Sequence, residues 1–204
     1  MDRNEGIIRW SPNTSRDEFM HINLNHRIVQ VYAATGHAKP GRFEYEKRSK
    51  HSEFLPLNTY DWSPHSRGLM AVGTGHGDVQ VLRVDDDSNA SITLQLKLQR
   101  SCQTVAFNTT GLLAVGLDRV RNDTCLQIWD VNQRLTDWDA SKPGFSSLSK
   151  PAVEPSAFKK LEASVSITSI RFFEDQPQTL IAGIRNSSLK IHDLRGKSVP
   201  DRSG

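Results

Sequence analysis

Four copies of one short pattern recur along this 204-residue chain, and this repeat constrains the fold more than any other feature. Each copy has a run that ends in an aromatic residue, then an apolar run, a polar turn and an alternating run. The separations from aromatic residue to alternating run are 21, 19, 21 and 19 positions, measured over Trp10–Val31, Trp62–Val81, Phe107–Ile128 and Phe172–Ile191. Such a constant register, with connections of varying length, indicates a repeated supersecondary unit.

The runs within each unit have the character of β-strands. They alternate with period 2, are rich in β-branched and aromatic residues, and are bounded by Ser-Pro or Asp/Asn/Gly turns. An outer strand is predicted at 42–47, 92–98 and 157–161. We place the units at about 6–48, 57–99, 102–163 and 166–196, with a polar tail at 197–204. Four-stranded units that recur every ~40–45 residues are typical of a β-propeller.

The predicted fold class is therefore all-β, a propeller portion with about four blades and an incomplete ring. The fourth unit lacks an outer strand, because only polar residues, glycine and proline follow Leu194 apart from Val199. We expect the chain to be a piece of a longer protein with further blades downstream. Its two terminal sheets then expose apolar faces, which predicts self-association.

The segment 134–154 stands apart from the repeat and is predicted to be a loop inserted in the third unit. It is rich in Ser, Pro and Asp, a composition that buries little apolar surface. Trp138 lies within it and is a candidate contact residue for a protein partner. A loop that folds back over this tryptophan is the alternative.

The glycine cluster Gly73-Thr74-Gly75-His76-Gly77-Asp78 raises the question of a phosphate-binding loop. Asp78 stands where a dinucleotide fingerprint needs its third glycine, and the next residues alternate as a strand instead of opening a helix. The Gly-Lys-Ser/Thr of a P-loop is missing as well. We interpret the cluster as a hairpin turn in which glycine supplies positive φ.

The sequence contains little that indicates metal binding or catalysis. Cys102 and Cys125 form no C-x-x-C pair, the seven histidines have no metal-ligand spacing, and no G-x-S-x-G motif occurs. We predict no catalytic residue, no cofactor and no metal, hence a protein that is not an enzyme. The rival is a propeller enzyme, which needs polar groups converging on a central channel. We see no recurrent charged residue at such a strand position.

The charge and the hydropathy of the chain limit the classes of partner that it is expected to bind. A net charge of +3 with interspersed signs favours neither nucleic acid nor a membrane surface, and no apolar run is long enough to span a bilayer. Two Ser-Pro pairs, at Ser11 and Ser63, are either turns or proline-directed phosphorylation sites.

Gln127-Ile128-Trp129-Asp130 resembles the Trp-Asp strand end of WD40 repeats. The unit that contains it reads AVGLDR at 114–119 and LQIWDV at 126–131, and it resembles the third unit of the missing-oocyte (Mio) family, called Sea4 in fungi. Further matching pieces lie in the other units, at 8–12, 69–73, 181–183 and 191–195.

This resemblance implies a non-catalytic WD40 scaffold in the activating half of the SEA complex, called the second GATOR complex in animals. It further implies that the protein promotes TOR signalling in response to amino acids. It implies a cytoplasmic protein that is peripheral at the vacuolar or lysosomal membrane and reaches it only through the complex. The expected partners are subunits of that complex. The family's helical region and zinc-binding domain have no counterpart here. The alternative is a WD40 substrate receptor, or a coat or nucleoporin scaffold.

Overall fold

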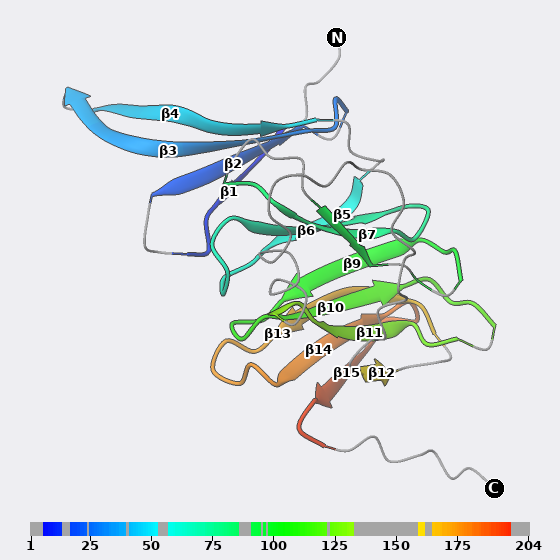
Figure 1. The fold of residues 1–204 in the computed structure, drawn as a ribbon. Coiled ribbons are helices and arrows are strands. Elements are labelled where there is room, and N and C mark those ends of the chain that lie inside the picture. The colour runs from blue at the N-terminus through cyan, green and yellow to red at the C-terminus, as the bar shows by residue number, and fades with distance from the viewer. Residues whose placement is uncertain are drawn as a thin grey trace, which may run out of the picture.

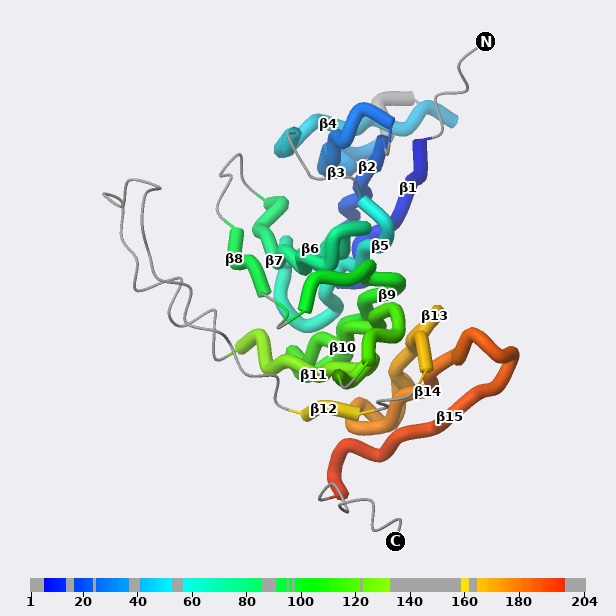
Figure 2. Tube along the Cα trace, turned by 90° about the vertical axis from the view of Figure 1, so that its right-hand side faces the viewer, coloured from blue at the N-terminus to red at the C-terminus, as the bar shows by residue number. Residues whose placement is uncertain are grey.

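A computed structural model describes residues 6–13, 17–23, 25–39, 41–52, 57–85, 91–94, 96, 98–121, 123–132, 159–161 and 165–196. These residues form fifteen β-strands in four antiparallel sheets, which confirms the all-β prediction. The sheets follow one another in chain order (Figure 1). The first and the last lie at opposite ends of the row in both views, so the described blades form an open arc of a propeller (Figure 2).

The first two sheets are four-stranded meanders. The strands of sheet 1 are β1 (Gly6–Trp10), β2 (Glu18–Asn23), β3 (Ile28–Lys39) and β4 (Arg42–His51), in that spatial order. Those of sheet 2 are β5 (Leu57–Trp62), β6 (Leu69–Thr74), β7 (Val79–Arg83) and β8 (Ser91–Leu94). β4 therefore runs to residue 51, beyond the 42–47 expected from its alternation, and β8 ends at 94 instead of 98.

The last two sheets repeat the meander. The strands of sheet 3 are β9 (Cys102–Phe107), β10 (Leu112–Leu117), β11 (Leu126–Asp130) and β12 (Lys159–Leu161). Those of sheet 4 are β13 (Ile167–Phe172), β14 (Thr179–Ile184) and β15 (Ser188–Asp193). Sheet 4 has three strands in the described part of the chain. The inserted segment predicted at 134–154, with Trp138, lies outside the described residues.

The core lies between neighbouring sheets, because the middle strands are apolar on both faces. Every residue of β6 and β10 is buried. Met20, Trp62 and Val72 belong to the cluster between sheets 1 and 2. Two further clusters fill the interfaces of sheet 3 with sheets 2 and 4. This two-sided burial explains why these strands read as continuous apolar runs.

One glycine in each of sheets 2, 3 and 4 marks a close approach between strands. Gly73, Gly116 and Gly183 pair in register with Thr59, Thr104 and Ser169, one on each innermost strand. A Cβ at Gly73 would overlap Cys102 Sγ and approach Thr59 Cγ2 to 2.7 Å. The recurrence of glycine in the repeat thus has a packing cause.

Candidate functional site

The innermost strands β1, β5, β9 and β13 end at a common cleft of about 500 Å³, which we call the inner-strand cleft. Its rim contains residues from the turns that follow these strands, and Asp61 and Arg171 line it from the strands themselves. The rim residues include Pro12, Pro64, Thr109 and Glu174. Four equivalent positions of the sequence repeat therefore meet at one place in the fold.

Short polar side chains shape the turns around this cleft. The Asn108 Oδ1 atom accepts hydrogen bonds from the backbone N–H groups of Thr110 (3.0 Å) and Leu112 (2.7 Å). Its Nδ2 donates to the carbonyl of Pro177 in the next sheet, at 2.7 Å. Asn108 thus stabilises its own turn and also links sheet 3 to sheet 4.

The two Ser-Pro pairs are turn residues in the structure. Ser63 is 1% exposed, and its Oγ accepts hydrogen bonds from the N–H groups of His65 (3.2 Å) and Ser66 (3.0 Å). Ser11 Oγ accepts a hydrogen bond from the N–H of Asn13 at 3.2 Å. In the folded chain the Ser63 hydroxyl is closed to a kinase, so the turn interpretation accounts for this pair.

Asp61 is the polar centre of the inner-strand cleft. Its Oδ2 accepts a hydrogen bond from the backbone N–H of Phe107 at 2.6 Å, across the gap between sheets 2 and 3. Thr59 Oγ1 receives the N–H of Val105 in the same way at 3.3 Å. Burial raises the pKa of the Asp61 carboxyl, while the Phe107 N–H bond and the charges of Arg171 and Arg9 oppose that rise.

The position just before each aromatic residue is charged in three of the four blades. It is occupied by Arg9, Asp61, Ala106 and Arg171, and Asp61 and Arg171 both line the inner-strand cleft. The expectation that no charged residue recurs at such a position is therefore wrong. The charges are visible at this position when the units are aligned on the aromatic residue that follows.

The glycine cluster is a hairpin turn, as expected from its sequence. Thr74 N–H donates to Asp78 O at 3.0 Å, Gly77 N–H donates to Thr74 O at 3.2 Å, and β7 follows directly. Gly77 has φ of +99°, which favours glycine, and a Cβ there would overlap the Arg100 carbonyl. The turn thus requires glycine for its backbone geometry and packing.

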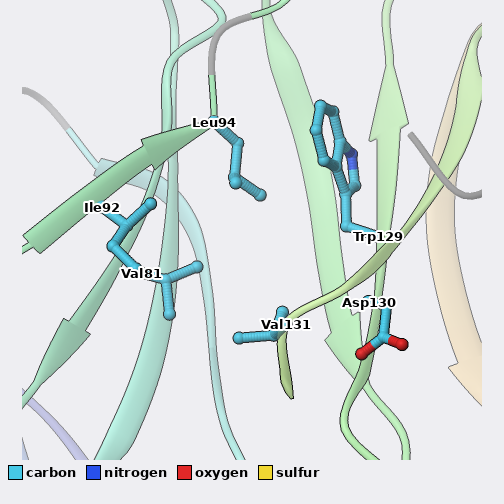
Figure 3. Close-up of a pocket in the computed structure, with 6 residues that line it drawn as sticks. All are labelled: Val81, Ile92, Leu94, Trp129, Asp130 and Val131. Carbon is cyan, nitrogen blue, oxygen red and sulfur yellow. The ribbon is translucent and has the colours of Figure 1, made fainter. Parts of the chain in front are cut away.

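The Trp129-Asp130 dipeptide is part of the packing between sheets 2 and 3 (Figure 3). Trp129 is 5% exposed and, with Val81 and Leu94, lines a small apolar pocket of about 10 Å³. Asp130 Oδ1 accepts the N–H of Asn132 at 3.0 Å, which shapes the end of β11. Both side chains therefore have a structural explanation.

Both cysteines are buried and free. Burial raises the pKa of the Cys102 thiol to about 12. Among the residues that the structure describes, no three His, Cys, Asp or Glu side chains are grouped as metal ligands. The same part of the chain contains no helix with the length and apolar character of a membrane span.

No family model matches this chain, but comparison with known proteins finds relatives that are similar in sequence. GATOR2 complex protein Mio of Drosophila melanogaster is 25% identical over 100% of this chain. SEH-associated protein 4 of Saccharomyces cerevisiae is 33% identical over 44% of it. A WD repeat-containing protein of Schizosaccharomyces pombe is 24% identical over 62%. The chain spans 22%, 8% and 12% of these proteins, respectively.

Among solved structures, Raptor of Chaetomium thermophilum superposes on 97% of this chain with a TM-score of 0.63 and 10% identity, over 16% of the Raptor chain. That likeness concerns the fold. Together with the blade repeat and the Trp129-Asp130 strand end, these matches define a WD40-type β-propeller protein with an open ring. The similarity to Mio extends over the whole chain, and with the similarity to SEH-associated protein 4 it supports membership of the Mio/Sea4 family.

Proposed function

We propose that this chain is a non-catalytic scaffold portion of a GATOR2/SEA-type complex that promotes TOR signalling in response to amino acids. The observation that carries the proposal is the similarity to Mio over the full length of the chain. In this proposal the chain acts in the cytoplasm and reaches the vacuolar or lysosomal membrane through its protein partners. Its contribution is to hold subunits together.

Two open sheet faces support a role in assembly. Ile8 and Trp10 of sheet 1 are 63% and 61% exposed, and Leu189 and Ile191 of sheet 4 are 68% and 65% exposed. Residues at these positions in the middle sheets are covered by a neighbouring blade. Exposed apolar surface of this kind is typical of contact faces. We propose that further blades or partner subunits cover them.

The inner-strand cleft is the proposed contact site of the scaffold. A half-buried carboxylate at Asp61 costs stability, since burial disfavours its charged form. An asparagine would still accept the Phe107 N–H without that charge. A charged residue that weakens the fold in this place favours a role in binding. Trp138 stays a second proposed contact residue, on the basis of the sequence.

Affinity purification of the full 204-residue chain from amino-acid-fed cells tests this function. We expect co-purification of GATOR2/SEA subunits with the unaltered chain and with Arg48→Gln, which changes an exposed side chain far from the cleft. Asp61→Asn is expected to reduce their recovery. Recovery of cullin adaptors or coat proteins in place of these subunits would refute the proposal.

A further inference from the structure

Three arginines lie on two neighbouring turns at the end of the blades opposite the inner-strand cleft. Arg119 and Arg121 belong to the connection between β10 and β11, and Arg185 begins the turn between β14 and β15. All three side chains are exposed. We call Arg119, Arg121 and Arg185 the arginine cluster. These turns join the second and third strands of their sheets, whereas the turns at the cleft join the first and second.

One buried serine brings the turns of two blades together. The backbone N–H of Arg119 donates to Ser166 Oγ at 2.9 Å, and that of Arg185 donates to the Ser166 carbonyl at 3.1 Å. Ser166 is 5% exposed. Two arginines from different sheets are therefore held beside the same residue, and their backbone positions are set before any partner arrives.

The acidic residues of the same connection are already engaged inside the fold. Asp123 Oδ2 lies 2.8 Å from Nη2 of the buried Arg100, and Asp118 Oδ2 accepts a hydrogen bond from Gln103 Nε2 at 3.0 Å. No salt bridge within 4.0 Å involves the arginine cluster among the described residues. The connection thus turns its carboxylates inward and its guanidinium groups outward.

The chemistry of this cluster fits carboxylates of a protein. Guanidinium groups bind carboxylates through two parallel hydrogen bonds. The large exposed apolar side chains of the described chain lie outside these two turns, and Val120, between the two arginines of the first turn, is half-buried. Neither turn therefore presents the exposed apolar face of a membrane-binding segment. We propose that Arg119, Arg121 and Arg185 form a docking surface for an acidic segment of a partner protein. This proposal is independent of which complex the chain joins.

Fluorescence anisotropy on the full 204-residue chain tests the proposal with defined probes. The probes are a labelled decapeptide of alternating Glu and Gly, its Gln–Gly counterpart, a single-stranded oligonucleotide, and vesicles containing phosphatidylserine. We expect binding of the Glu peptide alone, and its weakening as salt shortens the Debye length from ~14 Å toward ~5 Å. The triple change Arg119→Gln, Arg121→Gln and Arg185→Gln is expected to weaken this binding about tenfold.

A second triple variant serves as the matched control, since it removes the same charge elsewhere. Arg42→Gln, Lys47→Gln and Arg48→Gln alter exposed residues on the outer strand β4 of sheet 1. It is expected to bind the Glu peptide within about twofold of the unaltered chain, because these charges lie away from the cluster. Equal weakening in both triple variants overturns the docking surface. Preferential binding of vesicles or oligonucleotide that depends on the arginine cluster overturns it as well.

Discussion

The carboxylate of Asp61 and the backbone N–H of Phe107 join two neighbouring sheets through a hydrogen bond of 2.6 Å. β5 and β9 are both innermost strands, and among the described residues β9 is an edge strand of its sheet. Side chains of β5 therefore accept hydrogen bonds from the N–H groups of that edge: Asp61 from Phe107, and Thr59 from Val105. The contact gives the inner-strand cleft a charged centre. It also lowers folding stability, because burial disfavours the charged form of Asp61.

We predict that Asp61→Asn raises stability at neutral pH by about 1 kcal/mol, because the amide oxygen keeps the Phe107 bond without a half-buried charge. Burial raises the pKa of the folded-state carboxyl. The stability that the Asp61 carboxyl contributes is thus fully present below its pKa in the unfolded chain. It is lost as the pH rises through its pKa in the folded chain. Melting curves between pH 4 and 7 should show the variant's advantage grow with pH.

Asp193→Asn is the matched control for that measurement. Its exposed carboxyl is hydrogen-bonded by Arg195, which lowers the pKa of Asp193 to about 2. This opposite shift favours the charged form in the folded state, so the substitution is expected to give no gain in melting temperature. A lower melting temperature for Asp61→Asn at pH 7 would show that the charge stabilises the fold.

Gly73→Val is predicted to cost one to a few kcal/mol of stability, because its Cβ would overlap Cys102 Sγ at the interface of sheets 2 and 3. Gly75→Ala is the control, since the nearest atom to an added Cβ there is 3.7 Å away. Thermal melts of both variants decide the matter. An unchanged melt for Gly73→Val together with loss of nucleotide binding would restore the phosphate-loop interpretation.

Removal of the buried ion pair is expected to be far more costly than removal of an exposed one. Arg100→Met leaves Asp123 uncompensated in a largely buried place, with an expected loss of about 3 kcal/mol. Arg48→Met removes an exposed partner of Glu46 and should change stability by less than about 0.5 kcal/mol. Urea denaturation compares the two. Similar losses in both variants would contradict this account.

The open faces of sheets 1 and 4 predict self-association of the isolated chain. Leu189→Glu with Ile191→Glu places charge on the exposed face of sheet 4 and should shift the chain toward monomer in size-exclusion chromatography. Leu98→Glu alters an exposed leucine beyond the described strand β8 of sheet 2 and should leave the elution unchanged. A monomeric unaltered chain with one sharp melt would contradict the prediction.

Local sequence accounts for the strands and the repeat, because alternation, turn residues and glycine positions act over a few neighbouring residues. The turn at Gly77 and the buried strand Leu69–Thr74 could both be predicted in this way. Prediction was poorer for β4, which was expected only at 42–47. That strand continues to His51, where Ser49 donates a hydrogen bond to the Val84 carbonyl of the next sheet.

By itself, therefore, the sequence determined the all-β class, the spacing of the units and the family resemblance. The tertiary structure alone decided the functional geometry. Asp61 meets Phe107 and Arg119 meets Ser166 only after neighbouring sheets have stacked, at separations of 46 and 47 residues. No local pattern encodes such pairs, because the hydrophobic packing of one sheet on the next determines which polar atoms come within reach.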